Sequence, residues 1–178
     1  MECSSCGSTL GNPNIIDDVA YFVCSSCGNL REVEGYKEMS FSESIQLFES
    51  RFGFLLHSEF IGLLGEKGSW VVGLPQATTE MTKCYFGDGF YEFQRFPQAD
   101  PNSLNDTDSI FSSSSLVEEW GLPKELLLID GDGHTWLALD YRLDQQIPRV
   151  VVIETESFEY LVVADSFNKF LSQITSNE

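Results

Sequence analysis

The sequence predicts an α+β fold in which an antiparallel sheet is packed with helices, preceded by a small module built on four cysteines. Three observations predict it. The pentapeptide CSSCG occurs twice near the N-terminus. After residue 40, two apolar segments with helical spacing are followed by short apolar runs separated by turn residues. A last amphipathic segment after residue 165 completes the order helices, strands, helix, which is typical of an antiparallel α+β domain.

The four N-terminal cysteines have the spacing of a metal site. Cys3 and Cys6 form one C-x2-C pair, Cys24 and Cys27 form another, and residues 7–23 separate them. Four thiolates complete a tetrahedral shell around Zn²⁺ with no open position, which is typical of a structural rather than a catalytic ion. The module therefore resembles zinc ribbons. The alternatives are a chance cluster of cysteines and an opportunistic disulfide.

Apolar runs indicate three short strands in this module, at residues 15–16, 19–23 and 30–34. We expect the zinc ribbon to occupy residues 1–36 and a second domain to occupy residues 40–178. Residues 1–36 contain five acidic residues and one basic residue, a net charge of −4. A ribbon that binds nucleic acid would carry lysine or arginine on its strands. We therefore expect this ribbon to contact protein or to be purely structural.

Two apolar segments at the start of the larger domain have helical spacing. The first predicts a helix over residues 41–52, capped by Ser40 or Ser42 and ended by Gly53. Its apolar residues recur every three or four positions (Phe41, Ile45, Phe48 and Phe52). The second segment, FLLHSEFIGLL at residues 54–64, predicts another helix, which ends at Gly65.

The rest of the chain predicts strands, one long loop and two helices. Strands are expected at residues 70–74, 90–93, 126–129, 135–141, 149–154 and 160–164. Residues 97–115 are rich in Ser, Asn, Asp and Pro, so we expect a long surface loop that leads into a helix over residues 112–120. Asp165 or Ser166 caps a last helix that contains Phe167, Phe170, Leu171 and Ile174.

The net charge of −18 limits the classes of partner. It comes from 28 acidic and ten scattered basic residues, so direct binding of nucleic acid is not expected. An acidic surface favours a basic protein partner, although acidity also simply keeps a protein soluble. The apolar runs are too short to span a membrane, and the N-terminus lacks the pattern of a signal peptide. We therefore expect a cytoplasmic, reducing location.

The C-terminal half contains a series of motifs that occur in one order. They are Trp120-Gly-Leu-Pro123, Ile129-Asp-Gly-Asp-Gly133, Leu139-Asp-Tyr141, Pro148-Arg-Val150, Val151-Val-Ile-Glu154 and Val163-Ala-Asp-Ser-Phe167 followed by Phe170-Leu171. This series resembles the SUKH superfamily, the Smi/Knr-like proteins, and the likeness covers residues 41–175. Family members usually have a proline in the early helix, and His57-Ser-Glu-Phe60 lacks it. The resemblance implies binding rather than catalysis. Many bacterial members look like immunity proteins that neutralise toxins, often nucleases.

No motif in the chain indicates an enzyme. The turn that begins at Asp130 lacks the glycine and glutamate positions of a calcium-binding EF-hand, so it is interpreted as a hairpin turn. Neither His57 nor His134 lies in a nucleophile motif, and Cys84 has no Cys or His neighbour, so a small buried side chain is its default role. Walker and G-x-S-x-G motifs do not occur.

The leading hypothesis is therefore an immunity or antitoxin-like protein that binds a basic toxin domain. The candidate contacts are acids on the expected turns and near the sheet, namely Asp88, Glu92, Glu118, Glu119, Asp130, Asp132, Asp140 and Asp144. Trp120 and Trp136 either line a binding groove or belong to the core. The alternatives are a regulatory scaffold that binds a housekeeping protein and a zinc-ribbon adaptor to nucleic acid or the transcription machinery.

Overall fold

The computed structural model describes residues 2–8, 10, 14–16, 19–32, 39–75, 89–101 and 109–176. The chain divides into two compact units, residues 1–40 and residues 41–178. Every pair of named strands runs antiparallel, which confirms the mixed α and β class with antiparallel sheets. None of the helices in the described part of the chain combines the length and the apolar character needed to cross a bilayer.

The N-terminal unit contains one small sheet. Its three strands are β1 (Asn14–Ile16), β2 (Val19–Val23) and β3 (Leu30–Glu32), in the order β1-β2-β3. All three residues of β3 are exposed. The buried apolar cluster of its described residues consists of Cys3, Leu10 and Cys24, with Phe22 packed against it. A unit of only 40 residues usually needs an additional cross-link to fold, and a bound metal supplies one in many domains of this size.

The larger unit is built on a four-stranded sheet. Its strands follow the order of the chain: β6 (Leu126–Gly131), β7 (Thr135–Asp140), β8 (Arg149–Glu154) and β9 (Glu159–Ala164). In β8, Val150 and Val152 belong to the buried cluster on one face, while Val151 and Ile153 belong to the cluster on the other. Because both faces are covered, β8 is a continuous apolar run rather than an alternating one.

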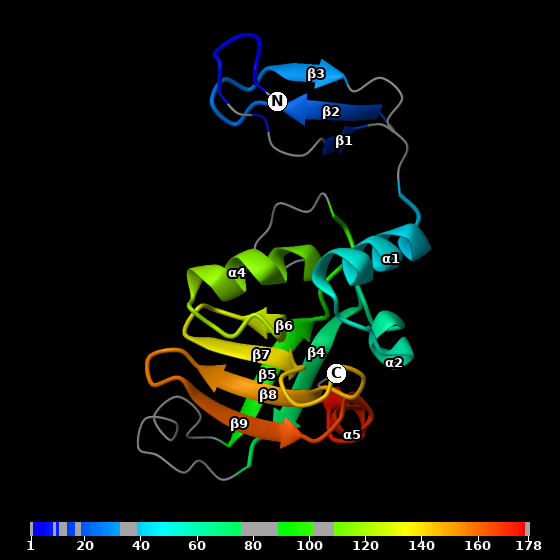
Figure 1. Ribbon diagram of the computed structural model, residues 1–178, viewed down its shortest axis with the longest axis vertical. Helices are drawn as coiled ribbons and strands as arrows, with labels where there is room; N and C mark the ends of the chain where they lie inside the picture. Colours follow the sequence, from blue (N-terminus) through cyan, green and yellow to red (C-terminus); the bar gives the residue numbers. More distant parts are fainter. Residues whose placement is uncertain are drawn as a thin grey trace. The chain divides into compact units, whose positions relative to one another are not determined.

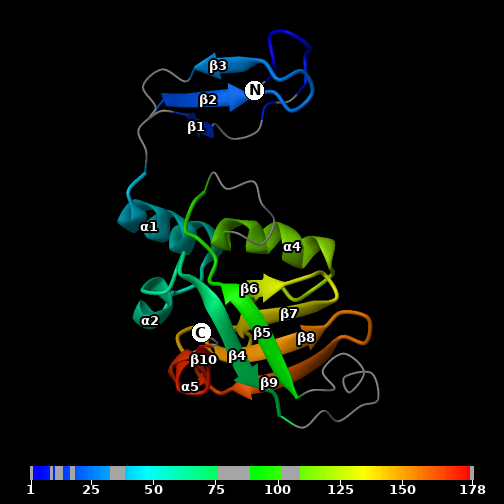
Figure 2. The same ribbon diagram turned by 180° about the vertical axis from the view of Figure 1, so that it is seen from behind.

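A second sheet crosses one face of the first. Its strands are β10 (Thr175–Ser176), β4 (Lys67–Gly73) and β5 (Phe90–Arg95), in the order β10-β4-β5. Figure 2 shows β4 and β5 running across the four-stranded sheet. Six fully buried phenylalanines fill this side of the core: Phe48, Phe60, Phe93, Phe96, Phe167 and Phe170. Their rings meet mostly edge to face or tilted, such as Phe60 and Phe167 at 5.3 Å between centroids.

The opposite face of the four-stranded sheet is covered by α4 (Ser113–Glu119), which lies along β6 in Figure 1. The 3-10 helix η1 (Ile110–Ser112) leads into it. Leu116 and Val117 of α4 pack in one cluster with Trp136 and Ala138 of β7. This face carries the site described below.

Two further helices, α1 and α5, match the sequence prediction in position. The helix α1 (Phe41–Phe52) has the predicted bounds, and Gly53 follows it with φ +76°. The helix α5 (Phe167–Leu171) is capped by Ser166, whose hydroxyl accepts a hydrogen bond from the Lys169 amide at 3.3 Å, but it is shorter than predicted.

The second predicted helix, over residues 54–64, is wrong in extent. Only α2 (Ser58–Ile61) is helical. In the non-helical segment before it, Leu56 is buried and Phe54 is half-buried. The amide of Leu56 donates to the carboxylate of Glu49 at 2.9 Å. Leu55 points outward and is 60% exposed. The apolar run therefore reflects partial burial of a non-helical segment and not the face of a helix.

The prediction of a long surface loop over residues 97–115 is also wrong for its described ends. Ala99, Ser109 and Ile110 are buried. Polar groups of the segment are paired with one another: the Ile110 amide donates to the Gln98 carbonyl at 2.9 Å, and the Ser109 hydroxyl donates to the Asp100 carbonyl at 2.6 Å. Polar backbone that is paired in this way can be buried. Residues 102–108 lie outside the described part of the chain.

Candidate functional site

The four N-terminal cysteines converge on one point. Their sulfur atoms all lie within 4.8 Å of one another. Cys3 Sγ lies 3.7 Å from Cys27 Sγ, and Cys6 Sγ lies 3.5 Å from Cys24 Sγ. A tetrahedral Zn²⁺ with bonds of about 2.3 Å places its sulfur ligands about 3.8 Å apart. A disulfide would need a distance of about 2 Å, and all four cysteines are free. The donor set therefore fits a structural metal ion.

The two cysteine pairs have the same backbone geometry. In each, the glycine after the second cysteine donates its amide to the carbonyl of the first cysteine: Gly7 to Cys3 at 2.8 Å and Gly28 to Cys24 at 2.7 Å. These glycines have φ of +74° and +70°, a region that side chains other than glycine rarely enter. The repeated CSSCG pentapeptide thus forms two equivalent turns, each presenting two sulfurs.

The two turns are also linked by side chains. Asn29 Nδ2 donates to Ser5 Oγ at 2.7 Å. The hydroxyl of Ser8 lies 3.4 Å from Cys6 Sγ and lowers the pKa of Cys6 to about 6. The backbone amide of Asn29 favours the Cys27 thiolate, but the neighbouring Cys6 and Cys24 sulfurs outweigh it and raise the pKa of Cys27 to about 12. Four thiolates this close together need a cation between them to ionise fully.

The candidate acidic contacts fall into different environments. Glu92, Glu118, Glu119, Asp132 and Asp144 are exposed, Asp130 is half-buried and Asp140 is fully buried. Asp88 lies outside the described residues. On α4, Glu118 and Glu119 are the last two residues of the helix. Asp132 lies in the turn between β6 and β7, whereas Asp140 and Asp144 lie at or beyond the opposite end of β7. The seven acids that the structure describes do not form one cluster.

One surface hollow does bring two of these acids together. We call it the Trp120 hollow; its lining residues are Leu116, Glu119, Trp120, Gly131, Asp132, Gly133 and Trp136. It has a volume of about 250 Å³. The rings of Trp120 and Trp136 have centroids 6.4 Å apart. The hollow thus joins the end of α4 to the turn between β6 and β7.

Two glycines let the indole rings lie directly on the turn. A Cβ atom on Gly131 would lie 2.2 Å from Cε3 of Trp136, and one on Gly133 would lie 2.5 Å from Cζ2 of Trp120. Gly133 also has φ +96°. The Gly-Asp-Gly sequence of this turn therefore has a packing role in addition to that of reversing the chain.

Asp132 is held in place by the turn that it belongs to. Its Oδ1 accepts hydrogen bonds from the amides of His134 at 3.0 Å and Thr135 at 2.8 Å and from the Thr135 hydroxyl at 3.2 Å. Partial burial disfavours the charged form, but these hydrogen bonds outweigh it and hold the pKa of Asp132 below its ordinary value. Its carboxylate is therefore ionised at neutral pH.

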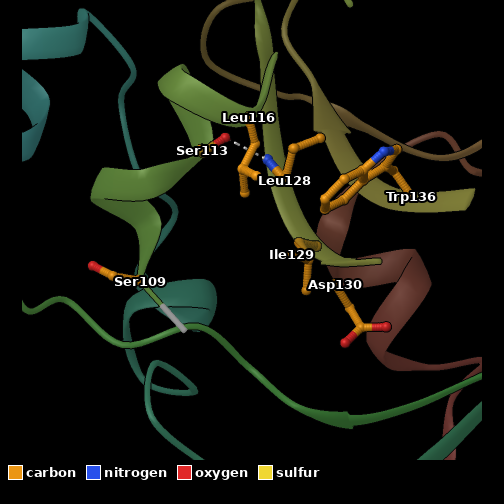
Figure 3. A pocket seen from close by; sticks show the side chains of 7 residues that line it. All are labelled: Ser109, Ser113, Leu116, Leu128, Ile129, Asp130 and Trp136. Atoms are coloured by element: carbon orange, nitrogen blue, oxygen red, sulfur yellow. Dashed lines mark hydrogen bonds between the residues drawn. The ribbon is translucent and has the colours of Figure 1, made fainter. Parts of the chain in front are cut away.

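A second, much smaller cavity lies beside the hollow, within the core. It has a volume of about 10 Å³, enough for roughly one water molecule. Figure 3 shows Ser109 and Ser113 on one side of it and Ile129 and Asp130 of β6 on the other. The Tyr91 hydroxyl donates to Asp130 Oδ2 at 3.0 Å, and burial raises the pKa of Asp130 despite this hydrogen bond. Asp130 is therefore a hydrogen-bond acceptor for a tyrosine of the interior.

Comparison with known families identifies the larger unit. The chain matches the SMI1/KNR4 family (SUKH-1) over residues 42–173, about three quarters of its length. The chain belongs to this family. No curated protein and no solved structure matches it. The SUKH match includes the Trp120 hollow and begins after the four cysteines, so the cysteine module lies outside the family match.

The sequence Trp120-Gly-Leu-Pro123 ends α4. Gly121 has φ +64° and donates its amide to the Glu118 carbonyl at 3.2 Å, and the Leu122 amide donates to the Val117 carbonyl at 2.8 Å. This pair of hydrogen bonds is a Schellman motif. It fixes where α4 ends, and thereby places Trp120 over the turn between β6 and β7.

Asp140, in the sequence Leu139-Asp-Tyr141, is buried and forms an ion cluster with two partly exposed arginines. Arg142 donates to the Asp140 carboxylate from Nε at 2.8 Å and from Nη2 at 3.0 Å, and Arg149 Nη2 donates to it at 2.7 Å. The guanidinium of Arg142 also lies 4.2 Å from the centre of the Tyr160 ring. Because Asp140 is buried and neutralised, we leave it out of the proposed contact surface.

The other residues considered from the sequence show no catalytic grouping among the described residues. His57 is half-buried and its Nδ1 lies 2.7 Å from Glu59 Oε2. His134 is exposed, with Nδ1 3.8 Å from Glu156 Oε1. Cys84 lies outside the described residues. Trp136 belongs to the core, with 2% of its surface exposed, and also lines the hollow, whereas Trp120 is half-buried.

Proposed function

We propose that this SUKH protein is an immunity-type binding protein that neutralises a basic protein toxin, such as a nuclease, through an acidic surface. A nuclease site is basic because it holds phosphate, so an acidic protein can occupy it in place of the substrate. The observation that carries the proposal is the Trp120 hollow, where exposed acids meet a half-buried tryptophan on a chain of net charge −18. Aromatic residues and charge complementarity are typical of protein interfaces.

The proposed contact surface is centred on Glu118, Glu119 and Asp132. Glu92, Asp130, Asp144 and Asp88 are further contacts in this proposal, with Asp88 included on its sequence position alone. The role is binding and not catalysis, and we place it in the cytoplasm, where thiols stay reduced. The acidity of the chain disfavours the alternative of an adaptor to nucleic acid.

We further propose that residues 1–36 form a zinc ribbon and residues 40–178 the partner-binding domain. Cys3, Cys6, Cys24 and Cys27 would hold one Zn²⁺, which the sulfur distances support. Four protein ligands leave no open coordination position, so the ion would cross-link the module and would not activate water. The small size of the N-terminal unit, residues 1–40, gives a physical reason for this cross-link.

The test is binding and protection against a toxin encoded beside the gene. The proposal expects the purified protein to bind this toxin and to inhibit it, and co-expressed protein to protect cells. Active toxin that is neither bound nor inhibited by folded protein would contradict it. A partner recovered equally from cells without the toxin would instead support the regulatory-scaffold alternative.

A further inference from the structure

The size of the Trp120 hollow suggests what it holds. Its volume of about 250 Å³ lies below the roughly 300–1,000 Å³ of small-molecule and cofactor sites. It is open to the surface and lies between a helix end and a turn. A hollow of this size suits one long side chain from another protein.

The carboxylate side chains that line the hollow are both acidic and carry the same negative charge. Glu119 and Asp132 both line it, and among the described residues neither forms an ion pair with a lysine or an arginine. All three hydrogen bonds that Asp132 accepts from described residues go to Oδ1, which leaves Oδ2 available. Two carboxylates beside a tryptophan ring form an environment that favours a cation.

The end of α4 gives an independent argument. Acidic side chains are unfavourable at the C-terminal end of a helix, where the backbone carbonyls already carry partial negative charge. Nevertheless α4 ends in Glu118-Glu119, and its last turn contains no basic residue. Residues that break a local rule of stability are often found at functional sites. A bound cation would relieve this unfavourable arrangement.

We propose that the Trp120 hollow is a subsite for an arginine side chain of the partner protein. The inference rests on the proposed function and specifies the chemistry of its contact. The planar guanidinium lies against the indole of Trp120, while Glu119 and Asp132 accept its N–H groups. Arginine fits better than lysine, because a guanidinium both stacks on an aromatic ring and donates several hydrogen bonds in one plane.

The first test uses a monovalent probe and nuclear magnetic resonance of the full chain. N-acetyl-L-arginine methylamide is titrated into ¹⁵N-labelled protein, and the indole N–H of Trp120 is assigned with Trp120→Phe. We expect a saturable shift of this signal. The citrulline analogue, a neutral isostere, should bind at least about tenfold more weakly because it lacks the charge.

A charge-matched pair of variants makes the test specific. Glu119→Gln with Asp132→Asn removes both carboxylates of the hollow while keeping side-chain size and hydrogen-bond acceptors, and should weaken arginine binding at least about fivefold. The control Glu66→Gln with Asp165→Asn removes two exposed charges elsewhere. It should change the affinity for the arginine probe less than about twofold. The proposal would be overturned if the citrulline analogue bound as tightly as the arginine probe. It would also be overturned if both double variants lost the same affinity for the arginine probe.

A second measurement separates this inference from the proposed function. The same two variants are compared for affinity to the toxin encoded beside the gene. If the affinity of the toxin for the Glu119→Gln, Asp132→Asn variant is within about twofold of its affinity for the native protein, the arginine subsite is wrong and the proposed function stands. If the toxin does not bind at all while the arginine probe still titrates at Trp120, the proposed function is wrong and the subsite stands.

Discussion

A Cβ atom on Gly133 would lie 2.5 Å from Cζ2 of Trp120, so the indole ring lies directly on the backbone of the turn between β6 and β7. This contact joins the end of α4 to the turn that carries Asp132. The position of Trp120, and with it the shape of the Trp120 hollow, therefore depends on Gly133 having no side chain.

Gly133→Ala should displace Trp120 and disrupt the hollow. The added methyl group meets the indole ring, and φ +96° is strained for alanine, so we expect a loss of unfolding free energy of about 2–3 kcal/mol. Urea denaturation measures the loss, and the Trp120 indole signal reports the displacement. The control is Gly89→Ala, which also has positive φ but no atom within 4 Å. An equal cost in both variants would contradict the packing role.

Gly121→Ala should destabilise the end of α4 through backbone conformation alone. A Cβ atom there meets nothing within 4 Å, but φ is +64°, so the cost is about 1 kcal/mol. The matched control is Gly73→Ala, which also has free space around it and an ordinary φ. It should change stability by less than about 0.5 kcal/mol. The proposed Schellman role of Gly121 fails if thermal denaturation gives the two variants the same stability.

Asp140→Asn should destabilise the larger unit because it leaves two arginines without their shared carboxylate. At pH 7 we expect a loss of about 3 kcal/mol in urea denaturation. Asp165→Asn, which breaks an exposed pair with Lys169, should cost less than about 1 kcal/mol. A native-like stability of Asp140→Asn would show that the buried cluster is dispensable.

The pH dependence of this loss follows from the pKa of Asp140. Burial alone would raise that pKa, but the hydrogen bonds from Arg142 and Arg149 outweigh it and lower it below the ordinary value of 3.8. The stabilisation is therefore present above about pH 4 and is lost as the pH falls through the lower folded-state value. The difference between native protein and Asp140→Asn should be constant from pH 7 to about pH 5 and shrink below about pH 4.

Freshly purified, reduced protein should contain about one equivalent of zinc per chain. Cys24→Ala removes one of the four thiolates and should lower the zinc content at least about tenfold at limiting free metal. Cys84→Ala changes the fifth cysteine, which belongs to neither C-x2-C pair in the sequence, and should leave the zinc content unchanged. Elemental analysis measures both. Less than about half an equivalent in the native protein would count against the four-thiolate site.

Many elements of this fold are predicted by local sequence patterns. The spacing of the cysteines predicts their convergence, because each C-x2-C-G stretch forms its turn from its own residues. The strands of the four-stranded sheet are predicted because each is a short apolar run bounded by turn residues. The Ser166 cap of α5 follows from the preference for serine at this position.

The features that the sequence does not predict depend on distant contacts. The residues of β10 carry no strand signal of their own and pair with β4, a hundred residues earlier in the chain. In the non-helical segment around Leu56, apolar side chains pack against the distant core, although no helix forms there. The Glu118-Glu119-Trp120 sequence is visible as an acidic and aromatic group, but its meeting with Asp132 and Trp136 comes only from tertiary packing.

The central claim is that an acidic surface of this SUKH protein recognises a basic partner, and the salt dependence of association tests it most directly. The association rate with the toxin encoded beside the gene is measured by stopped flow at about 20 mM and 200 mM ionic strength. We predict a fall of at least about tenfold, because screening removes the attraction between opposite charges. An association rate that does not change with salt would contradict the account.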